Sequence, residues 1–310
     1  MSREPIAAAA VVGGAASVQV GAAIGATIFP LVGPGGVVAL RQAFAAVALL
    51  AVARPRLRDL TWRSVRPALL LGLVLVSMNL GVYGAIDRIG LGLAVTLEFL
   101  GPLALALAGS RRRIDLLCAA MAGLGVVLLT GTVPGIDPVG VLFALVAAAS
   151  WAAYIVLSRR AGRTLPGVQG TALASLLAAV LTSPLLVMAL VGLAPHQLLH
   201  VVVVGLATGI LSSAIPYSID LLVLRRMSQQ LFSVLQSVQP AAAALAGFIV
   251  LGQALATWQL VGLGLISLGN VIAVTRPTRA APTRTPPTRA AATPSPSPSP
   301  TPTARPLADG

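Results

Sequence analysis

The stretch Ala94-Val-Thr-Leu-Glu-Phe-Leu-Gly-Pro102 carries a carboxylate and a proline inside an apolar run that extends from Leu91 to Ala108. An acidic side chain in hydrocarbon costs at least ~2.5 kcal/mol, so it is usually retained for a function. Proline removes a backbone hydrogen bond and bends the helix that contains it. The stretch therefore predicts a bent helix that carries the acid Glu98 to membrane depth, one turn before Pro102.

The composition places the chain among integral membrane proteins. Of its 310 residues, 57% are hydrophobic and 9% are charged, and the mean hydropathy is +0.93. A soluble domain is typically about 25% charged. The net charge of +13 comes from arginines that lie between apolar runs and form no basic face with interleaved aromatic residues, which argues against nucleic-acid binding. A single cysteine, Cys118, offers no disulfide framework.

Apolar segments of spanning length recur along the chain. A transmembrane helix needs about 17 to 25 apolar residues, and turn residues or charges separate the segments here. For the first segment the alternative is a cleaved signal peptide, but the apolar run is long for that purpose. We predict an all-α integral membrane protein with ten transmembrane helices, at about residues 7–29, 35–53, 67–86, 91–109, 114–131, 139–157, 168–190, 199–223, 231–251 and 257–274.

The arginines predict the orientation, because cytoplasmic loops are rich in Arg and Lys. With the N-terminus inside, 19 arginines fall on the cytoplasmic side, Arg88 falls outside, and Arg41 lies within the second segment. We expect a multi-pass protein of a bacterial plasma membrane with both termini in the cytoplasm. Residues 276–310 are rich in Pro, Ser, Thr and Arg and cannot bury a core, which predicts a disordered cytoplasmic tail.

The chain shows signs of an internal repeat. The matching features are Pro102 and Pro240, 138 residues apart; Gly123-Leu-Gly125 and Gly262-Leu-Gly264, 139 apart; and Gly14-Ala-Ala-Ser17 and Ala147-Ala-Ala-Ser150, 133 apart. Nearly equal offsets predict two halves of five helices, at residues 7–131 and 139–274. Because five is odd, the second half would be inverted in the membrane. Inverted repeats are typical of secondary transporters, which bind their substrate near the bilayer midplane between the halves.

Glu98 and Arg41 are the two charged candidates for the site. At 1.5 Å per residue, Glu98 would lie ~10 Å below the outer surface. It could carry a proton or hold a substrate ammonium group, or it could be a structural acid satisfied by a neighbouring helix. Arg41 enters the membrane from the same side. It could pair with Glu98 or bind a substrate carboxylate, or extend to the interface.

Polar and aromatic side chains in otherwise aliphatic segments are further candidates for the substrate pathway. Gln239 precedes Pro240, and Gln236 occupies the position that corresponds to Glu98 in the other half. Amides can bind a zwitterion without changing charge, or simply join helices. An interfacial aromatic belt is the alternative for Tyr83 and Tyr154. The other candidates are Gln19, Asn79, Trp151 and Tyr217.

Prolines and glycines predict where helices break or approach one another. Pro216, like Pro102 and Pro240, is expected to break its helix. Two Gly-xxx-Gly patterns, Gly21 to Gly25 and Gly205 to Gly209, allow close helix packing.

Several functions lack the residues that they require. There is no phosphate-binding lysine loop for ATP, and no catalytic constellation. His196 and His200 have no acidic partner nearby in the sequence, so we expect no zinc site. We therefore expect no enzymatic activity, cofactor or metal. The expected partners are a small-molecule substrate and the lipid bilayer, and the expected assembly is a monomer or homodimer.

Several motifs resemble one transporter family. They are Ser17-Val-Gln-Val-Gly21, Phe29-Pro-Leu-Val-Gly33, Val38-Ala-Leu-Arg41, Leu93-Ala-Val-Thr-Leu-Glu-Phe-Leu-Gly-Pro-Leu103 and Leu211-Ser-Ser-Ala-Ile-Pro-Tyr-Ser218. Over about residues 15–272 the chain resembles the drug/metabolite transporter superfamily with two EamA-type repeats, and within it the threonine and homoserine exporters. The resemblance implies ten helices in two inverted halves and proton-driven efflux of small amino acids.

The chain also departs from the pattern of that family. It has Gln239-Pro240 where the family often has Glu-Pro, and Leu251-Gly-Gln253 where it often has Leu-Gly-Glu. If proton coupling occurs, it must therefore depend on Glu98. Alternative functions are transport of another metabolite or a drug and, from a different class, a membrane scaffold without transport activity.

Overall fold

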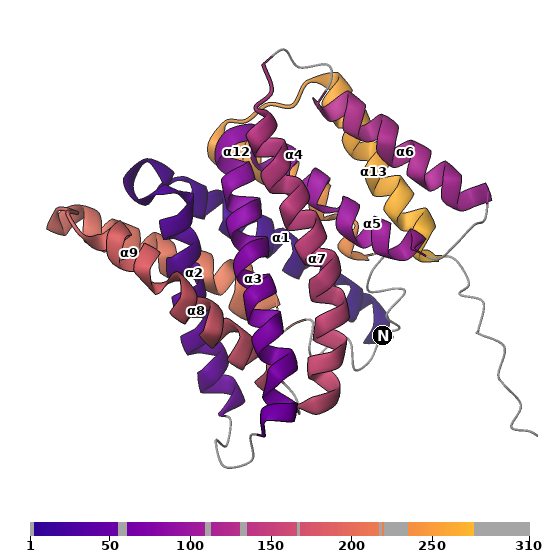
Figure 1. Ribbon diagram of the computed structural model, residues 1–310. Helices are drawn as coiled ribbons and strands as arrows, with labels where there is room; N and C mark the ends of the chain where they lie inside the picture. Colours follow the sequence, from indigo (N-terminus) through magenta and orange to yellow (C-terminus); the bar gives the residue numbers. More distant parts are fainter. Residues whose placement is uncertain are drawn as a thin grey trace, which may run out of the picture. The chain divides into compact units, whose positions relative to one another are not determined.

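Helices account for nearly all of the residues that the computed structural model describes, which are 3–54, 61–108, 113–130, 135–165, 168–216, 219 and 235–275 (Figure 1). No strand occurs among these residues. The helices are α1 (Arg3–Ala26), α2 (Phe29–Ala53), α3 (Trp62–Ile89), α4 (Leu91–Glu98), α5 (Leu100–Leu107), α6 (Arg113–Thr130), α7 (Pro138–Thr164), α8 (Gln169–Leu190), α9 (Pro195–Gly209), the π-helical turn η2 (Ile210–Ala214), α12 (Gln239–Leu251) and α13 (Thr257–Thr275). The predicted tail, 276–310, lies outside the described residues.

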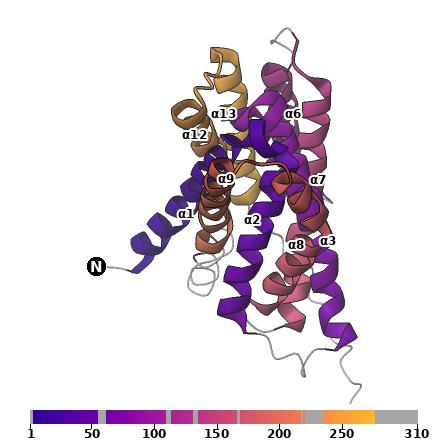
Figure 2. The ribbon, with the colours of Figure 1, turned by 90° about the vertical axis from the view of Figure 1, so that its left-hand side faces the viewer.

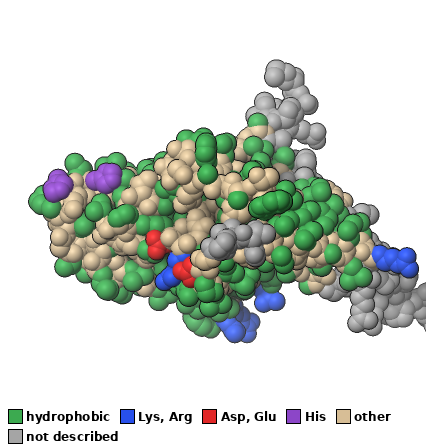
Figure 3. All heavy atoms as spheres, turned by 90° about the horizontal axis from the view of Figure 1, so that it is seen from above, with side chains coloured by type: hydrophobic (Ala, Val, Ile, Leu, Met, Phe, Trp, Pro, Cys, Tyr) green, Lys and Arg blue, Asp and Glu red, His purple; other side chains and the backbone are tan. Residues whose placement is uncertain are grey.

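The described helices suit a lipid environment. By length and composition, six are long and apolar enough to cross a membrane: Ala9–Ala26, Phe29–Ala53, Trp62–Ile89, Pro138–Gly162, Gln169–Leu190 and Pro195–Ala214. Four shorter apolar helices are Leu91–Leu105, Leu116–Thr130, Gln239–Leu251 and Thr257–Ala273. Large apolar side chains such as Leu116, Met188 and Trp258 are exposed, and few charged groups interrupt the hydrophobic surface in the view from above (Figure 3). The described part of the chain is thus all-α, and its apolar helices are consistent with a multi-pass membrane protein.

Capping groups and glycine set several helix ends that hydrophobicity alone misplaced. α3 begins five residues before the predicted start because Thr61 and Ser64 cap it reciprocally. Asp137 starts α7, since its Oδ1 accepts from the Val139 N–H at 2.8 Å. α2 begins at Phe29 and is interrupted at Gly33, whose φ of 66° is outside the helical region. The sequence prediction placed the start of this helix at residue 35, so it missed the part of α2 that precedes the interruption.

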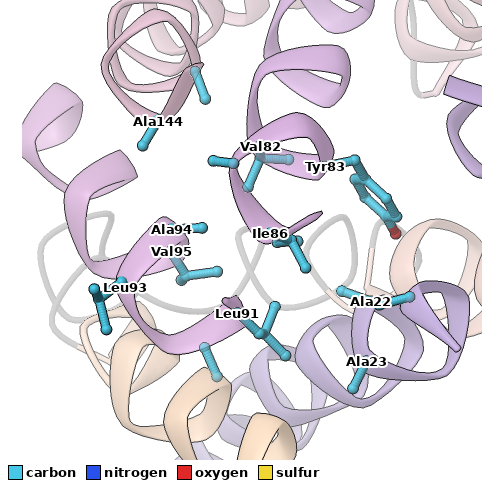
Figure 4. Close-up of a cluster of buried hydrophobic side chains, with 14 of the residues drawn as sticks. Ala22, Ala23, Val82, Tyr83, Ile86, Leu91, Leu93, Ala94, Val95 and Ala144 are labelled. Carbon is cyan, nitrogen blue, oxygen red and sulfur yellow. The ribbon is translucent and has the colours of Figure 1, made fainter. Parts of the chain in front are cut away.

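Most packing contacts join the first part of the chain to the second part. α3 lies beside α7 (Figure 1), α2 beside α8 (Figure 2), and α6 beside α13. α4 packs between α12 and α7, while α1 packs against α12 and η2. Figure 4 shows Val82, Tyr83 and Ile86 of α3 in one buried cluster with Leu91 of α4 and Ala22 of α1. The same cluster includes Leu97 and Phe99, the residues on either side of Glu98.

Candidate functional site

The acid of the opening motif lies at a helix break. α4 ends at Glu98, Phe99 forms a turn, and α5 begins at Leu100. Pro102 has no N–H and cannot bond to the backbone carbonyl of Glu98, which is four residues earlier. The side chain of Glu98 is only 8% exposed. The proline thus places an acid and a backbone carbonyl without its helical partner at the same point of the helix.

The second half contains a similar break. Residues 235–236 are helical, 237–238 form a turn, and α12 begins at Gln239. Pro240 stands four residues after Gln236, as Pro102 stands four residues after Glu98. Both Gln239 and Pro240 are buried. Residues 231–234 of the predicted segment lie outside the described residues.

Arg41 of α2 binds three neutral oxygen atoms. Its Nη1 donates to Asn79 Oδ1 at 2.6 Å, its Nη2 to the Ser212 carbonyl at 2.9 Å, and its Nε to Ser213 Oγ at 3.1 Å. Asn79 is oriented in turn by donating from Nδ2 to the Leu75 carbonyl at 2.7 Å. Arg41 is 7% exposed, so it does not extend to an interface. The network joins α2, α3 and the π-helical turn.

Glu98 and Arg41 lie in the same buried region without forming a contact ion pair. Leu40, next to Arg41, and Leu97, next to Glu98, belong to one cluster of buried side chains. Among the described residues, however, Glu98 makes no hydrogen bond and no ion pair within 4.0 Å. The arrangement therefore contains a cation held by neutral oxygens and a nearby acid without a direct partner.

Three glutamines form a chain of hydrogen bonds that joins α1 to the break before α12. Gln19 Nε2 donates to Gln239 Oε1 at 3.0 Å, and Gln239 Nε2 donates to Gln236 Oε1 at 3.1 Å. Gln19 and Gln239 are buried, while Gln236 is half-buried. These bonds join α1 to α12 through uncharged groups.

The aromatic candidates lie in different surroundings. Tyr83 is 1% exposed, with its ring centroid 5.7 Å from Arg41 Cζ and in edge contact with Phe29, so it is not part of an interfacial belt. Its hydroxyl group is buried without a hydrogen-bond partner among the described residues. Trp151 contacts the ring of Phe99, directly after Glu98. Tyr154 packs in a separate cluster of α3, α7 and α8, and Tyr217 lies outside the described residues.

Three serines belong to this arrangement although sequence reasoning did not select them. Ser212 and Ser213 lie in η2 and contact Arg41. Ser17 Oγ donates to the Leu211 carbonyl at 2.8 Å. The sequence feature that could have identified them is the pair Ser212-Ser213 just before Pro216, and Pro216 is buried directly after η2. A proline that removes a backbone donor creates a need for side-chain donors nearby.

The C-terminal end of α3 carries a second group of polar contacts. Arg88 Nη1 and Asp137 Oδ2 form an ion pair at 2.6 Å. The hydrogen bond from Arg88 lowers the pKa of Asp137 below its usual value, and the bond from the Val139 N–H adds to this effect. Nearby, Gln253 Oε1 accepts from the Leu91 N–H at 2.9 Å and lies beside a cavity of about 350 Å³. No group of His, Cys, Asp and Glu in the described part of the chain is suited to a metal ion.

Known proteins resemble the chain in sequence over most of its length. The sequence model of the EamA-like transporter family matches residues 138–275. The threonine/homoserine exporter RhtA of Escherichia coli strain K12 is 40% identical over 268 residues, covering 84% of this chain and 89% of the relative. The exporter of the same name from Salmonella typhimurium strain LT2 is 38% identical over 269 residues, with the same coverage of each chain.

The fold also has a solved counterpart. A crystal structure that is 22% identical superposes with a TM-score of 0.59 and covers 86% of this chain and 96% of the other. This likeness supports the fold, whereas the sequence likeness to the exporters extends over nearly their whole length and assigns the family. The chain belongs to the EamA-like transporter family of the drug/metabolite transporter superfamily.

Proposed function

We propose that the protein is a secondary active exporter of small amino acids such as threonine and homoserine, driven by the proton gradient. The observation that carries the proposal is Glu98, an acid at the break of an apolar helix that has no direct partner in the described part of the chain. The surrounding chain is similar to threonine/homoserine exporters. Glu98 would bind either the proton or the substrate ammonium group. The amides of Gln19, Gln236 and Gln239 and the hydroxyl group of Tyr83 would line the pathway.

The helix contacts support two inverted halves of five spans each, residues 7–131 and 139–274. If a twofold axis relates the two halves, each contact between a span of the first half and a span of the second half must have a counterpart. The contact of α1 with α12 corresponds to that of α7 with α4 and α5, and the contact of α2 with α9 corresponds to that of α8 with α3. The contact of α3 with α7 corresponds to that of α9 and η2 with α1. The pairs α2–α8, α4–α12 and α6–α13 each connect equivalent spans. This pattern is expected of ten spans related by a twofold axis in the membrane plane.

The orientation belongs to the same proposal. With both termini in the cytoplasm, 19 of the 21 arginines lie on the inner side. The break at Glu98 would then be reached from the outer end of α4 and the break at Gln236 from the inner end of its span. Two breaks at similar depth would form a site that each side of the membrane can reach in turn.

Glu98→Gln tests the coupling. In proteoliposomes with an imposed pH gradient, we expect the wild type to accumulate labelled threonine and the variant to lose accumulation by about tenfold or more, the scale of losing one essential proton-transfer group. Exchange of threonine at equal pH requires substrate binding without net proton movement, so it should persist in the variant where Glu98 binds only the proton and be lost where Glu98 binds the substrate ammonium group. An uncoupler should reduce wild-type accumulation to the level of the variant.

Two further variants control for this experiment. Glu98→Asp retains the acid and should retain part of the coupling. Asp87→Asn removes an exposed acid at the end of α3 and should leave transport unchanged. A wild type that moves neither threonine nor homoserine would refute the substrate, and full gradient-driven accumulation by Glu98→Gln would refute the coupling.

A further inference from the structure

The π-helical turn η2 depends on side chains from other helices. A π-helical turn contains an extra residue and is often found at functional sites. Pro216, just after the turn, supplies no N–H to the carbonyls that precede it. The Leu211 carbonyl accepts from Ser17 Oγ at 2.8 Å, and the Ser212 carbonyl accepts from Arg41 Nη2 at 2.9 Å. Since an unsatisfied carbonyl is strongly unfavourable in a membrane, these donors stabilise the turn.

The two donors differ in what can compete for them. Ser17 belongs to a close contact in which Ser212 Oγ also donates to the Val18 carbonyl at 3.0 Å, so α1 holds the turn through neutral groups. Arg41 carries a charge that the neutral oxygens of Asn79, Ser212 and Ser213 do not balance. A carboxylate binds guanidinium more strongly than neutral acceptors do, and with two parallel bonds.

Glu98 is placed to be that carboxylate. It lies on α4, which packs against α3, the helix whose Asn79 and Tyr83 contact Arg41. It has no hydrogen bond of its own within the described residues. Tyr83 also faces the guanidinium group, with its ring centroid 5.7 Å from Arg41 Cζ. It offers a ring face and a hydroxyl group. Arg41 therefore has two alternative partners, the π-helical turn of the second half and the acid of the first half.

We propose that Arg41 is a positioning residue that holds the π-helical turn in this state and exchanges the turn for the Glu98 carboxylate during the transport cycle. A proton or a substrate ammonium group on Glu98 removes the competing anion, so Arg41 remains on Ser212 and Ser213. When Glu98 is ionised and unoccupied, Arg41 moves toward it and the turn loses one of its two side-chain donors. The turn then becomes a hinge between α9 and Pro216. This inference deepens the proposed transport function and rests on it, because a transport cycle exists only in a transporter.

Hydrogen–deuterium exchange of the full-length protein in lipid nanodiscs tests the exchange of partners. In Arg41→Gln, we expect amides in peptides that cover η2 to exchange about tenfold faster, the factor that corresponds to one charge-assisted hydrogen bond. Arg41→Lys should be intermediate, because an ammonium group cannot reach three separated acceptors at once. Peptides from α8 should not change and serve as the internal reference.

Glu98→Gln separates the proposal from a purely structural role of Arg41. Removing the competing anion should slow exchange in η2 by about threefold or more relative to the wild type, and Asp87→Asn should leave it unchanged. Equal or faster exchange in Glu98→Gln would overturn the proposal, as would unchanged exchange in Arg41→Gln. If Arg41→Gln does not fold, the comparison of Glu98→Gln with the wild type still decides. The readout needs no substrate, so failure of threonine transport would refute the proposed function without affecting this result.

Discussion

At the scale of single residues, three polar side chains of the described part of the chain lie where a proline has removed a backbone donor. Glu98 and Gln236 each lie four residues before a proline, and Ser212 lies four residues before Pro216. Each proline leaves the carbonyl of that residue without its usual donor. At Ser212 a side chain of another helix supplies the bond. At these three positions a polar residue and a helix-breaking proline occur together, and together they place polar groups inside an apolar bundle.

Gly21 is a residue at which α1 closely approaches the π-helical turn η2. A Cβ atom on Gly21 would lie 2.8 Å from Leu211 Cβ, and Ser212 would also have to move. We expect Gly21→Ala to destabilise the protein by about 1–3 kcal/mol, the usual cost of overpacking. Thermal unfolding in detergent should show the loss.

Gly13→Ala is the matched control in the same helix. A Cβ atom on Gly13 meets nothing within 4 Å. This substitution should be neutral, or stabilising by up to ~1 kcal/mol through the higher helix propensity of alanine. Equal melting temperatures for the two variants would contradict the proposed close contact between α1 and η2.

At the scale of helices, polar groups at the helix ends set where helices start and which ends meet. Asp137 caps α7 and also binds Arg88 at the end of α3, so one side chain starts a helix and joins it to its main packing partner. Gln253 does the same between α12 and α4 by accepting the first N–H of α4. Water reaches the Arg88–Asp137 pair, because both side chains are partly exposed.

The Arg88–Asp137 pair predicts a pH-dependent contribution to stability. Because the pKa of Asp137 is lowered in the folded protein, its contribution is complete above the unfolded pKa of about 3.9 and is lost as the pH falls through the lower folded value. Asp137→Asn retains a capping side chain but loses the charge. It should lower the melting temperature slightly at pH 6, and the difference should vanish in strong acid.

The control for this prediction is Asp87→Asn. Asp87 is exposed near the same helix end and forms no ion pair with a described residue. Any difference in melting temperature between the wild type and Asp87→Asn should not disappear as the pH falls. A difference between wild type and Asp137→Asn that stays constant down to the lowest pH would mean that the ion pair contributes nothing.

At the scale of the whole molecule, the distribution of arginines predicts how the chain lies in the membrane. If both termini are cytoplasmic, trypsin should cleave at Arg111 to Arg113 in sealed inside-out vesicles and leave right-side-out vesicles uncut. A cysteine at His196 should react with an impermeant maleimide only in right-side-out vesicles. Cleavage at Arg111 to Arg113 from the outer side would overturn the orientation.

The sequence alone determined the class of the protein and the positions of its apolar segments, and it predicted candidate residues for a polar site. Hydrophobic length and the scarcity of charge follow directly from the solvent that surrounds the chain. The family resemblance, which rested on the Glu98 motif and Arg41, was likewise readable and agrees with the relatives. Helix ends were less accurate, because caps such as Thr61 act through a few local hydrogen bonds.

Only the tertiary structure decided which polar groups are partners. The sequence left open whether Arg41 pairs with Glu98, binds substrate or extends to an interface. In the folded chain it binds Asn79, Ser212 and Ser213 instead. Those serines are 171 and 172 residues away in the sequence, and no local pattern specifies a bond over such a distance. The reason is physical: partner choice depends on which helix faces meet, and packing of apolar surfaces from the whole bundle determines that.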